Sequence, residues 1–349
     1  IDSTSIGGTI SGAITVCSGS NSTLLTLNGY RGTIQWQSAT LAGGFSNING
    51  ATSFNYTAAG LTSSTRYRAV VTSGVCAAVN SDTSIITVDP ISVAGNITGI
   101  KTVCTGSNTT TLTLNGSVGA VISWQSSTDN SSFSTIENAT ATTYTAVDLT
   151  QNTYYRAIVK SGVCGPDTSA AVMMTVSPAT VVGNVSNDTT VCASSSNITL
   201  SLSGNTGSIQ WQVASSLGGT YNNISAATSS TVSTGTLSAT RYYRVRVVSG
   251  VCDTLYSREI TVTVSPATNA GTVSGASTVC TGTNSTQLDL TGSVGAIIWQ
   301  ESSDSTTFTD IASATASAYT ATNLTQSNFY RAKVASGVCD TLFSNMIKV

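Results

Sequence analysis

The 349-residue chain has no histidine and few charged residues. Without histidine, neither a Ser-His-Asp or Cys-His catalytic arrangement nor a histidine-ligated metal site can form. Charged residues make up 8% of the sequence and the formal net charge is −2, so the chain lacks the basic surface that binds nucleic acid or an anionic membrane. We therefore predict no enzymatic activity, no cofactor and no nucleic-acid partner for this segment.

Other signatures are missing as well. No apolar run reaches the roughly 18 residues of a membrane-spanning helix, and the cysteines lack the C-x-x-C spacing of zinc sites. No acidic cluster recurs that would bind calcium. The first residues, IDSTSIGG, contain neither a start methionine nor a signal peptide. We expect the chain to be a segment of a longer array.

What the sequence does contain is a fourfold internal repeat of about 88 residues. Cysteine and tryptophan recur at this step, at Cys17, Cys104, Cys192 and Cys280, at Cys76, Cys164, Cys252 and Cys339, and at Trp36, Trp124, Trp211 and Trp299. Pro90, Pro178 and Pro266 close three of the copies. The predicted domains are residues 1–90, 91–178, 179–266 and 267–349, joined by stiff proline linkers into an extended rod.

Each copy shows about seven short runs of alternating or β-branched residues with turn signals between them. In residues 91–178, for example, TTTLTLNG is followed by VISWQSS and TYYRAIVKSG. This pattern predicts an all-β fold built from β-sandwich domains. We expect a core of the tryptophans together with Tyr67, Tyr155, Tyr243 and Tyr330, and we also place Phe45, Phe133, Tyr221 and Phe308 in it.

The order Leu-x-Leu, Trp, Leu and then Tyr-x-small resembles the immunoglobulin fold. The tyrosines that we place in the core hold the position of the tyrosine corner. The two positions that are normally bridged cysteines are instead apolar pairs such as Leu114 and Ala157. The resemblance implies four immunoglobulin-like domains whose central disulfide is replaced by apolar packing.

The cysteines then lie at the two ends of each sandwich, one before strand B and one in the turn between strands F and G. Two pairings remain open, and we lean to the first because isolated repeats usually fold independently. The first joins cysteines within a copy, Cys17 to Cys76, Cys104 to Cys164, Cys192 to Cys252 and Cys280 to Cys339. The second joins consecutive copies, Cys17 to Cys164, Cys104 to Cys252 and Cys192 to Cys339, and leaves Cys76 and Cys280 for further copies.

Two features of the predicted surface are candidate sites. Arginines on strand F should point outward near glutamines on strand C, as a ligand-binding stripe or, as we favour, a solvated face; these are Arg68, Arg156, Arg244 and Arg331 with Gln37, Gln125, Gln212 and Gln300. The tripeptides DTT and DTL resemble the short O-glycosylation signal of Bacteroidota surface proteins. That resemblance makes Thr189, Thr254 and Thr341 candidate acceptors.

The phrases TVC-x-G, WQ-S and SGVC, with a trailing V-x-V-x-P, resemble the immunoglobulin-like tandem repeats of Bacteroidota type IX-secreted adhesins, which include the SprB type of gliding motility. The resemblance implies an extracellular, outer-membrane-anchored fibre that presents adhesive regions. Its implied partners are neighbouring repeats, an external surface or glycan, and anchoring or motility machinery outside this segment. Alternatives are a glycan-binding module that acts by avidity and spacer domains of a secreted enzyme.

Overall fold

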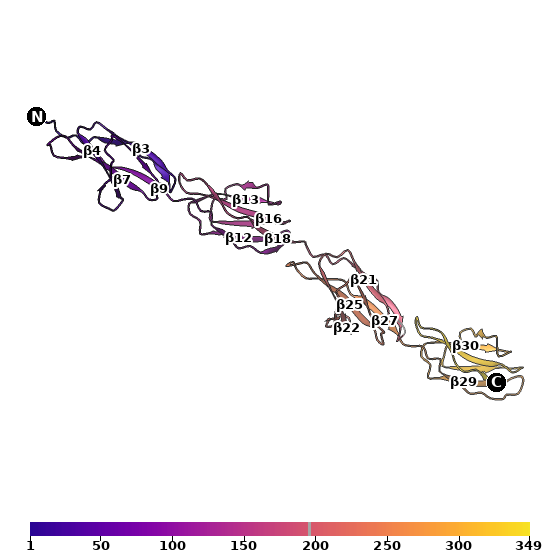
Figure 1. Cartoon of the computed structure of the whole chain (residues 1–349). Coiled ribbons are helices and arrows are strands. Elements are labelled where there is room, and N and C mark those ends of the chain that lie inside the picture. Colours follow the sequence, from indigo (N-terminus) through magenta and orange to yellow (C-terminus); the bar gives the residue numbers. More distant parts are fainter. Residues whose placement is uncertain (195–196) are drawn as a thin grey trace. The chain divides into compact units, whose positions relative to one another are not determined.

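The structure is a computed structural model that describes residues 1–194 and 197–349. Over these residues it contains strands and no helix, and the predicted all-β architecture of four sandwich repeats is confirmed. The chain divides into two compact units, Ile1–Ser177 and Pro178–Val349, and each unit holds two repeats. Figure 1 shows the strands of each repeat, coloured by position in the sequence.

The first repeat pairs a three-stranded sheet with a six-stranded one. The small sheet has the order β1-β3-β6, with β1 at Thr9–Ser11, β3 at Ser22–Asn28 and β6 at Asn55–Ala59. The large sheet has the order β2-β9-β7-β4-β5, with β8 on β7; the bounds are β2 Thr15–Cys17, β4 Thr33–Thr40, β5 Ser46–Asn47, β7 Thr65–Thr72, β8 Val79–Asn80 and β9 Ser84–Asp89. Strand β2 is parallel to β9, and the other pairs are antiparallel. This is an immunoglobulin-like topology, in which the first strand is divided between the two sheets.

The second repeat has the same order in β10 to β18, with sheets β10-β12-β15 and β11-β18-β16-β13-β14 and with β17 on β16. Its strands are β10 Asn96–Thr98, β11 Thr102–Cys104, β12 Thr109–Asn115, β13 Ala120–Ser127, β14 Ser134–Ile136, β15 Thr143–Val147, β16 Thr153–Lys160, β17 Asp167–Thr168 and β18 Val172–Ser177. Strand β11 is parallel to β18. The first two repeats therefore share one topology.

The third and fourth repeats form the second unit. The third contains β19 Asn184–Val185, β20 Thr189–Cys192, β21 Thr199–Ser203, β22 Ser208–Ala214, β23 Asn222–Asn223, β24 Thr231–Ser233, β25 Arg241–Val248, β26 Leu255–Tyr256 and β27 Ile260–Ser265. The fourth contains β28 Thr272–Ser274, β29 Ser285–Thr291, β30 Ala296–Ser302, β31 Thr309–Asp310, β32 Ala318–Thr322, β33 Phe329–Ala335, β34 Leu342–Phe343 and β35 Ile347–Lys348. Both repeats keep the division into a three-stranded sheet and a larger sheet.

Each core is organised around its tryptophan, which is fully buried. In the first repeat the Trp36 indole N–H donates to the Ser53 carbonyl at 2.8 Å, which satisfies the one polar atom of the ring. Tyr56 lies between Trp36 and Tyr67, with ring centroids 5.8 and 5.6 Å apart. The apolar pair that replaces the usual central disulfide, Leu27 and Ala69, is buried in the same cluster. The alternation along the strands therefore delivers these side chains to one interior.

Four aromatic residues that we predicted for the core lie elsewhere. Phe45, Phe133, Tyr221 and Phe308 are only half-buried and belong to none of the four core clusters. Each lies over the guanidinium group of an arginine on strand F, on the outer face of the large sheet. Strand F is β7, β16, β25 and β33 in the four successive repeats. This part of the core prediction is therefore wrong, because these residues lie outside the strands, where alternation does not specify a face.

Candidate functional site

The recurring sequence Ser-Gly-Val-Cys forms a tight turn after strand F. In the second repeat the Cys164 N–H donates to the Ser161 carbonyl at 2.8 Å, and Gly162 between them has a φ of +46°. Positive φ at the first central residue alone is the mark of a type II′ turn, which glycine adopts without steric cost. The corresponding Cys-to-Ser hydrogen bond is present in all four repeats, at 2.8 to 3.0 Å.

This turn docks on the linker that leads into its own repeat. The Val163 N–H donates to the Asp89 carboxylate and the Ser161 N–H to the Ser92 hydroxyl, both at 2.9 Å. Asp89 is the last residue of β9 in the first repeat, so the contact joins two consecutive repeats. A β-carbon at Gly162 would overlap the Asp89 carboxylate. Glycine thus suits the turn and leaves room for the Asp89 side chain, which a β-carbon would force to shift.

We call the connection between two consecutive repeats the joint; at the first one, the turn at residues 161–164 binds Asp89 and Ser92. A disulfide bond reinforces this joint. Cys17 is bonded to Cys164, with Cα atoms 4.9 Å apart. In the parallel ladder of β2 and β9, Cys17 lies directly opposite Asp89, the residue before Pro90. The first two repeats are therefore joined by two covalent connections that leave from neighbouring strands, one through the Pro90 peptide and one through the disulfide.

The second unit has the same bond between Cys192 and Cys339, also with Cα atoms 4.9 Å apart. Both bonds belong to the second of the two pairings considered from the sequence. Every pair of the within-repeat scheme contains one of these four cysteines, so that pairing, which we favoured, is wrong. The reason is that β9 runs antiparallel to β7, with Ile86 opposite Thr65. The end of β9, next to Cys17, is therefore far from the turn after β7 that carries Cys76.

The remaining cysteines divide into two groups. Cys76 and Cys280 are free thiols, whereas Cys104 and Cys252 are not free. Cys76 lies in the first repeat where Cys164 lies in the second. Its turn is held by the residues that precede β1, since the Val75 N–H donates to the Asp2 carboxylate at 3.1 Å. Asp2 thus takes the place at the first repeat that Asp89 takes at the second.

The linker contacts recur in the second unit with hydroxyl groups. The Ser249 N–H donates to the Thr180 hydroxyl at 3.0 Å and the Ser336 N–H to the Thr268 hydroxyl at 3.1 Å. Gly337 approaches Ser265 so closely that a β-carbon would overlap its hydroxyl. The joint is therefore built from the same turn with a Ser or Thr hydroxyl as acceptor, and this common geometry explains why Ser-Gly-Val-Cys is repeated.

The arginine row on strand F points outward as predicted, but its arginines are engaged within the protein. Arg156 Nε donates to Gln125 Oε1 at 2.7 Å, and its guanidinium carbon lies 3.8 Å from the centroid of the Phe133 ring. Such a cation–π contact stabilises by about 0.5–1 kcal/mol at an exposed site. In the third and fourth repeats a second ring covers the arginine, Tyr256 on Arg244 and Phe343 on Arg331. The row is therefore a stacked surface layer.

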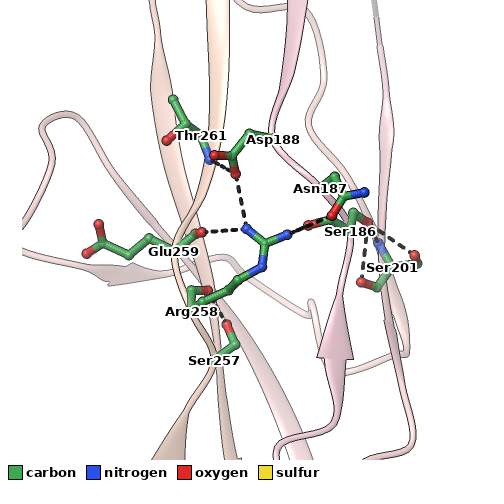
Figure 2. Close-up of polar contacts among 8 residues, drawn as sticks. All are labelled: Ser186, Asn187, Asp188, Ser201, Ser257, Arg258, Glu259 and Thr261. Carbon is green, nitrogen blue, oxygen red and sulfur yellow. Dashed lines mark hydrogen bonds and ion pairs between the residues drawn. The ribbon is translucent and has the colours of Figure 1, made fainter.

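A separate polar cluster surrounds Arg258 in the third repeat (Figure 2). Arg258 forms an ion pair with Asp188 at 3.1 Å and also donates to the Ser186 carbonyl. The Thr261 N–H donates to Asp188 at 3.0 Å, and this bond is the main reason why the pKa of Asp188 is lowered. The ion pair is solvent-exposed and contributes little to stability. The cluster ties the segment before β20 to the segment before β27, which is a structural role.

The candidate acceptor threonines lie near the surface. Thr189 and Thr341 are exposed and Thr254 is half-buried. Thr254 and Thr341 each follow a joint cysteine by two positions, Cys252 and Cys339. All three therefore lie where the chain is at least partly open to solvent.

Among the residues described, no group of three or more His, Cys, Asp or Glu side chains lies close enough together to hold a metal ion. In the same part of the chain no helix has the length and apolarity needed to cross a membrane.

Comparison with solved structures shows the fold. The four-domain D1–D4 ectodomain fragment of ICAM-5 superposes with a TM-score of 0.50 and 12% identity, over 98% of each chain. A three-domain titin fragment, an E-to-A mutated variant, gives a TM-score of 0.47 and 12% identity over 73% of this chain and 94% of the titin chain. No curated protein matches the sequence.

One family model matches the sequence four times in succession, over residues 6–90, 93–178, 181–266 and 269–349. Its description is "Domain of unknown function (DUF8696)". These matches cover nearly the whole chain, which therefore belongs to the DUF8696 family and carries four consecutive copies of its domain.

Proposed function

We propose that these repeats are a stalk segment of a large bacterial cell-surface adhesin or fibre, which extends adhesive regions away from the cell. Tandem immunoglobulin-like repeats suggest an extracellular stalk or spacer. Disulfide bonds persist in oxidising surroundings, outside the cytosol. The structural observation that carries the proposal is the joint. In each unit a disulfide, a glycine turn and backbone hydrogen bonds connect one repeat to the next.

The joint favours a stalk because it restricts how consecutive repeats can move. A single-peptide linker leaves two domains free to bend and twist. Here the Pro90 peptide and the Cys17–Cys164 bond act side by side, and the Ser161 and Val163 amides bind the linker between them. Two connections a short distance apart oppose bending and twisting. A repeat array with such joints holds its length, which is what a stalk requires.

The finer features of the proposal come from the resemblance to Bacteroidota adhesins. They are export by type IX secretion, anchoring at the outer membrane and a part in gliding motility. The free thiols fit an array of more than four repeats, since Cys76 and Cys280 occupy the positions of joint cysteines. We propose that each bonds to a cysteine of a further repeat. Alkylation of the native protein before reduction tests this, because a labelled Cys76 or Cys280 would contradict it.

The O-glycosylation proposal is tested separately. Thr189, Thr254 and Thr341 are the proposed acceptors, and intact glycopeptide mass spectrometry of the protein from its source organism should find hexose-containing adducts on them. Unmodified peptides at all three positions would remove the proposal. The stalk would be unaffected by that result, since it rests on the joints.

The stalk proposal is tested on cells of the organism that makes the protein. An antibody to the repeats should label intact cells, and protease added outside should release the repeat region. Deletion of Pro178–Val349, one whole compact unit, should bring the adhesive end closer to the cell and weaken attachment. Insertion of two unrelated immunoglobulin-like domains in its place should restore both. Labelling only after cell lysis, or attachment unchanged by the deletion, would contradict the proposal.

A further inference from the structure

We infer that the inter-repeat disulfides carry tension past the folded sandwiches, so that pulling on the ends of the chain cannot draw the repeats out. This inference rests on the proposed function, because a stalk that holds a cell to a surface is under tension.

The Cys17–Cys164 disulfide encloses most of the strands of the first two repeats. In the first unit, tension that enters at residue 1 reaches Cys17, crosses to Cys164 and leaves along β17 and β18. The two cysteines are 147 positions apart. All strands from β3 to β16 therefore lie in a closed loop, outside the shortest covalent path, and the force does not act through their ends.

The path is also nearly extended in the folded state. Strand β2 is parallel to β9, so both run toward the joint and end there, at Cys17 and Asp89. Beyond the disulfide, the path follows β17 and β18 to Ser177, and β18 is parallel to β11, which runs toward the far end of the second repeat. Strands β17 and β18 are both antiparallel to β16 and so run in the same direction, which leaves no reversed strand on this part of the path and little spare length in it.

The length to which the first unit can be stretched depends on how many residues lie on the shortest covalent path. The first unit has 177 residues, and excluding the 147 positions of the loop leaves about 30. At about 3.5 Å per residue, this path can stretch to roughly 100 Å, against roughly 600 Å without the disulfide. In the folded first repeat, the eight-residue strands β4 and β7 are each about 27 Å long. Unfolding both repeats would therefore add little length while the bond is intact.

The second unit repeats the arrangement, with Cys192 and Cys339 also 147 positions apart. The two loops do not overlap. Over the whole chain of 349 residues, about 55 positions remain on the shortest path. The fully stretched oxidised chain should therefore measure roughly 200 Å, and the reduced chain roughly 1,200 Å.

The test is to pull the full 349-residue chain by handles at its two ends in optical tweezers. Cys76→Ser and Cys280→Ser are included throughout, because free thiols could exchange with the bonds under study. We expect the oxidised chain to stay near 200 Å at forces that unfold ordinary immunoglobulin domains. Adding a phosphine reductant to the same molecule should open the disulfide loops and lengthen the chain by about 1,000 Å, in steps as the repeats unfold.

A matched pair of variants locates the effect. Cys17→Ser with Cys164→Ser should lengthen the oxidised chain by about 400–500 Å, and Cys192→Ser with Cys339→Ser should do the same through the other unit. In-place reduction of the unsubstituted bonds covers the case in which a variant fails to fold, because it acts on protein that has already folded. Steps of about 270 Å in the oxidised chain, one for each repeat of about 88 residues, would overturn the inference.

The outcomes separate this inference from the stalk proposal. If the oxidised chain lengthens repeat by repeat while the cell experiments succeed, the tension path is wrong and the stalk stands. If the oxidised chain stays short but the protein is absent from the cell surface, the mechanical property stands and the proposed function is wrong.

Discussion

Removing the Cys17–Cys164 bond should destabilise both repeats that it connects, although it lies in the core of neither. If the first repeat unfolds while the second stays folded, Cys17 and Pro90 both remain attached to the second repeat at one joint. The unfolded segment is then a closed loop of about 73 residues. Closure of such a loop lowers the entropy of the unfolded state by an amount that stabilises the repeat by about 4 kcal/mol.

The assay is hydrogen exchange with mass spectrometry on the oxidised full chain, comparing Cys17→Ser/Cys164→Ser with the parent protein. Peptides that contain Trp36 and Ala69, both fully buried in the first repeat, should exchange up to about 1,000-fold faster, because each 1.4 kcal/mol is a factor of ten. Peptides around Trp124 should respond similarly. Peptides of the second unit should not change, which makes them the internal control.

The reciprocal variant, Cys192→Ser with Cys339→Ser, should move the effect to the third and fourth repeats. If the faster exchange is confined to a few residues around the removed cysteines, the closed-loop reasoning is refuted. That result would mean that the bond only orders the joint and that each repeat is stable by itself.

Other predictions concern single residues. Gly162→Ala should speed reduction of the Cys17–Cys164 disulfide. The new β-carbon would overlap the Asp89 carboxylate, in addition to the roughly 1–2 kcal/mol that a positive φ costs alanine. Gly116→Ala also has a positive φ but open space around it, so it should leave the reduction rate unchanged. Burial raises the pKa of Tyr67 to about 12, so the folded state holds the phenolic proton more tightly. The resulting stability is present below pH 10 and is lost toward pH 12; ultraviolet absorbance should show this tyrosine ionising late, and Tyr67→Phe should reduce the loss. Amide hydrogen bonds to Asp129 hold its pKa well below the usual range. Its contribution is present above about pH 4 and is lost as the pH falls through the folded pKa, so carboxyl NMR should find it ionised after ordinary aspartates have protonated.

Local sequence patterns predict much of the fold. The spacing of cysteine and tryptophan gives the four repeats, and alternation along strands such as Ser22–Asn28 identifies which leucines face inward. The same reasoning failed for Phe45 and its equivalents, which stack on arginines outside the core. A large aromatic residue in a loop can cover either face of a sheet, and in each repeat this ring stacks on the neighbouring strand F arginine.

The all-β class, the repeat length and the buried tryptophans can be predicted from the amino-acid sequence, because these depend on side-chain periodicity and on contacts within one repeat. The sequence also places the cysteines at the ends of the sandwich. Their pairing cannot be read from the spacing, since Cys17 could be matched to Cys76 or Cys164 with equal regularity along the chain. The parallel pairing of β2 with β9 brings Cys17 to the exit of its repeat, beside Asp89. There the nearest cysteine is Cys164, in the turn of the next repeat, because disulfide formation depends on distance in space, which sequence separation does not reveal.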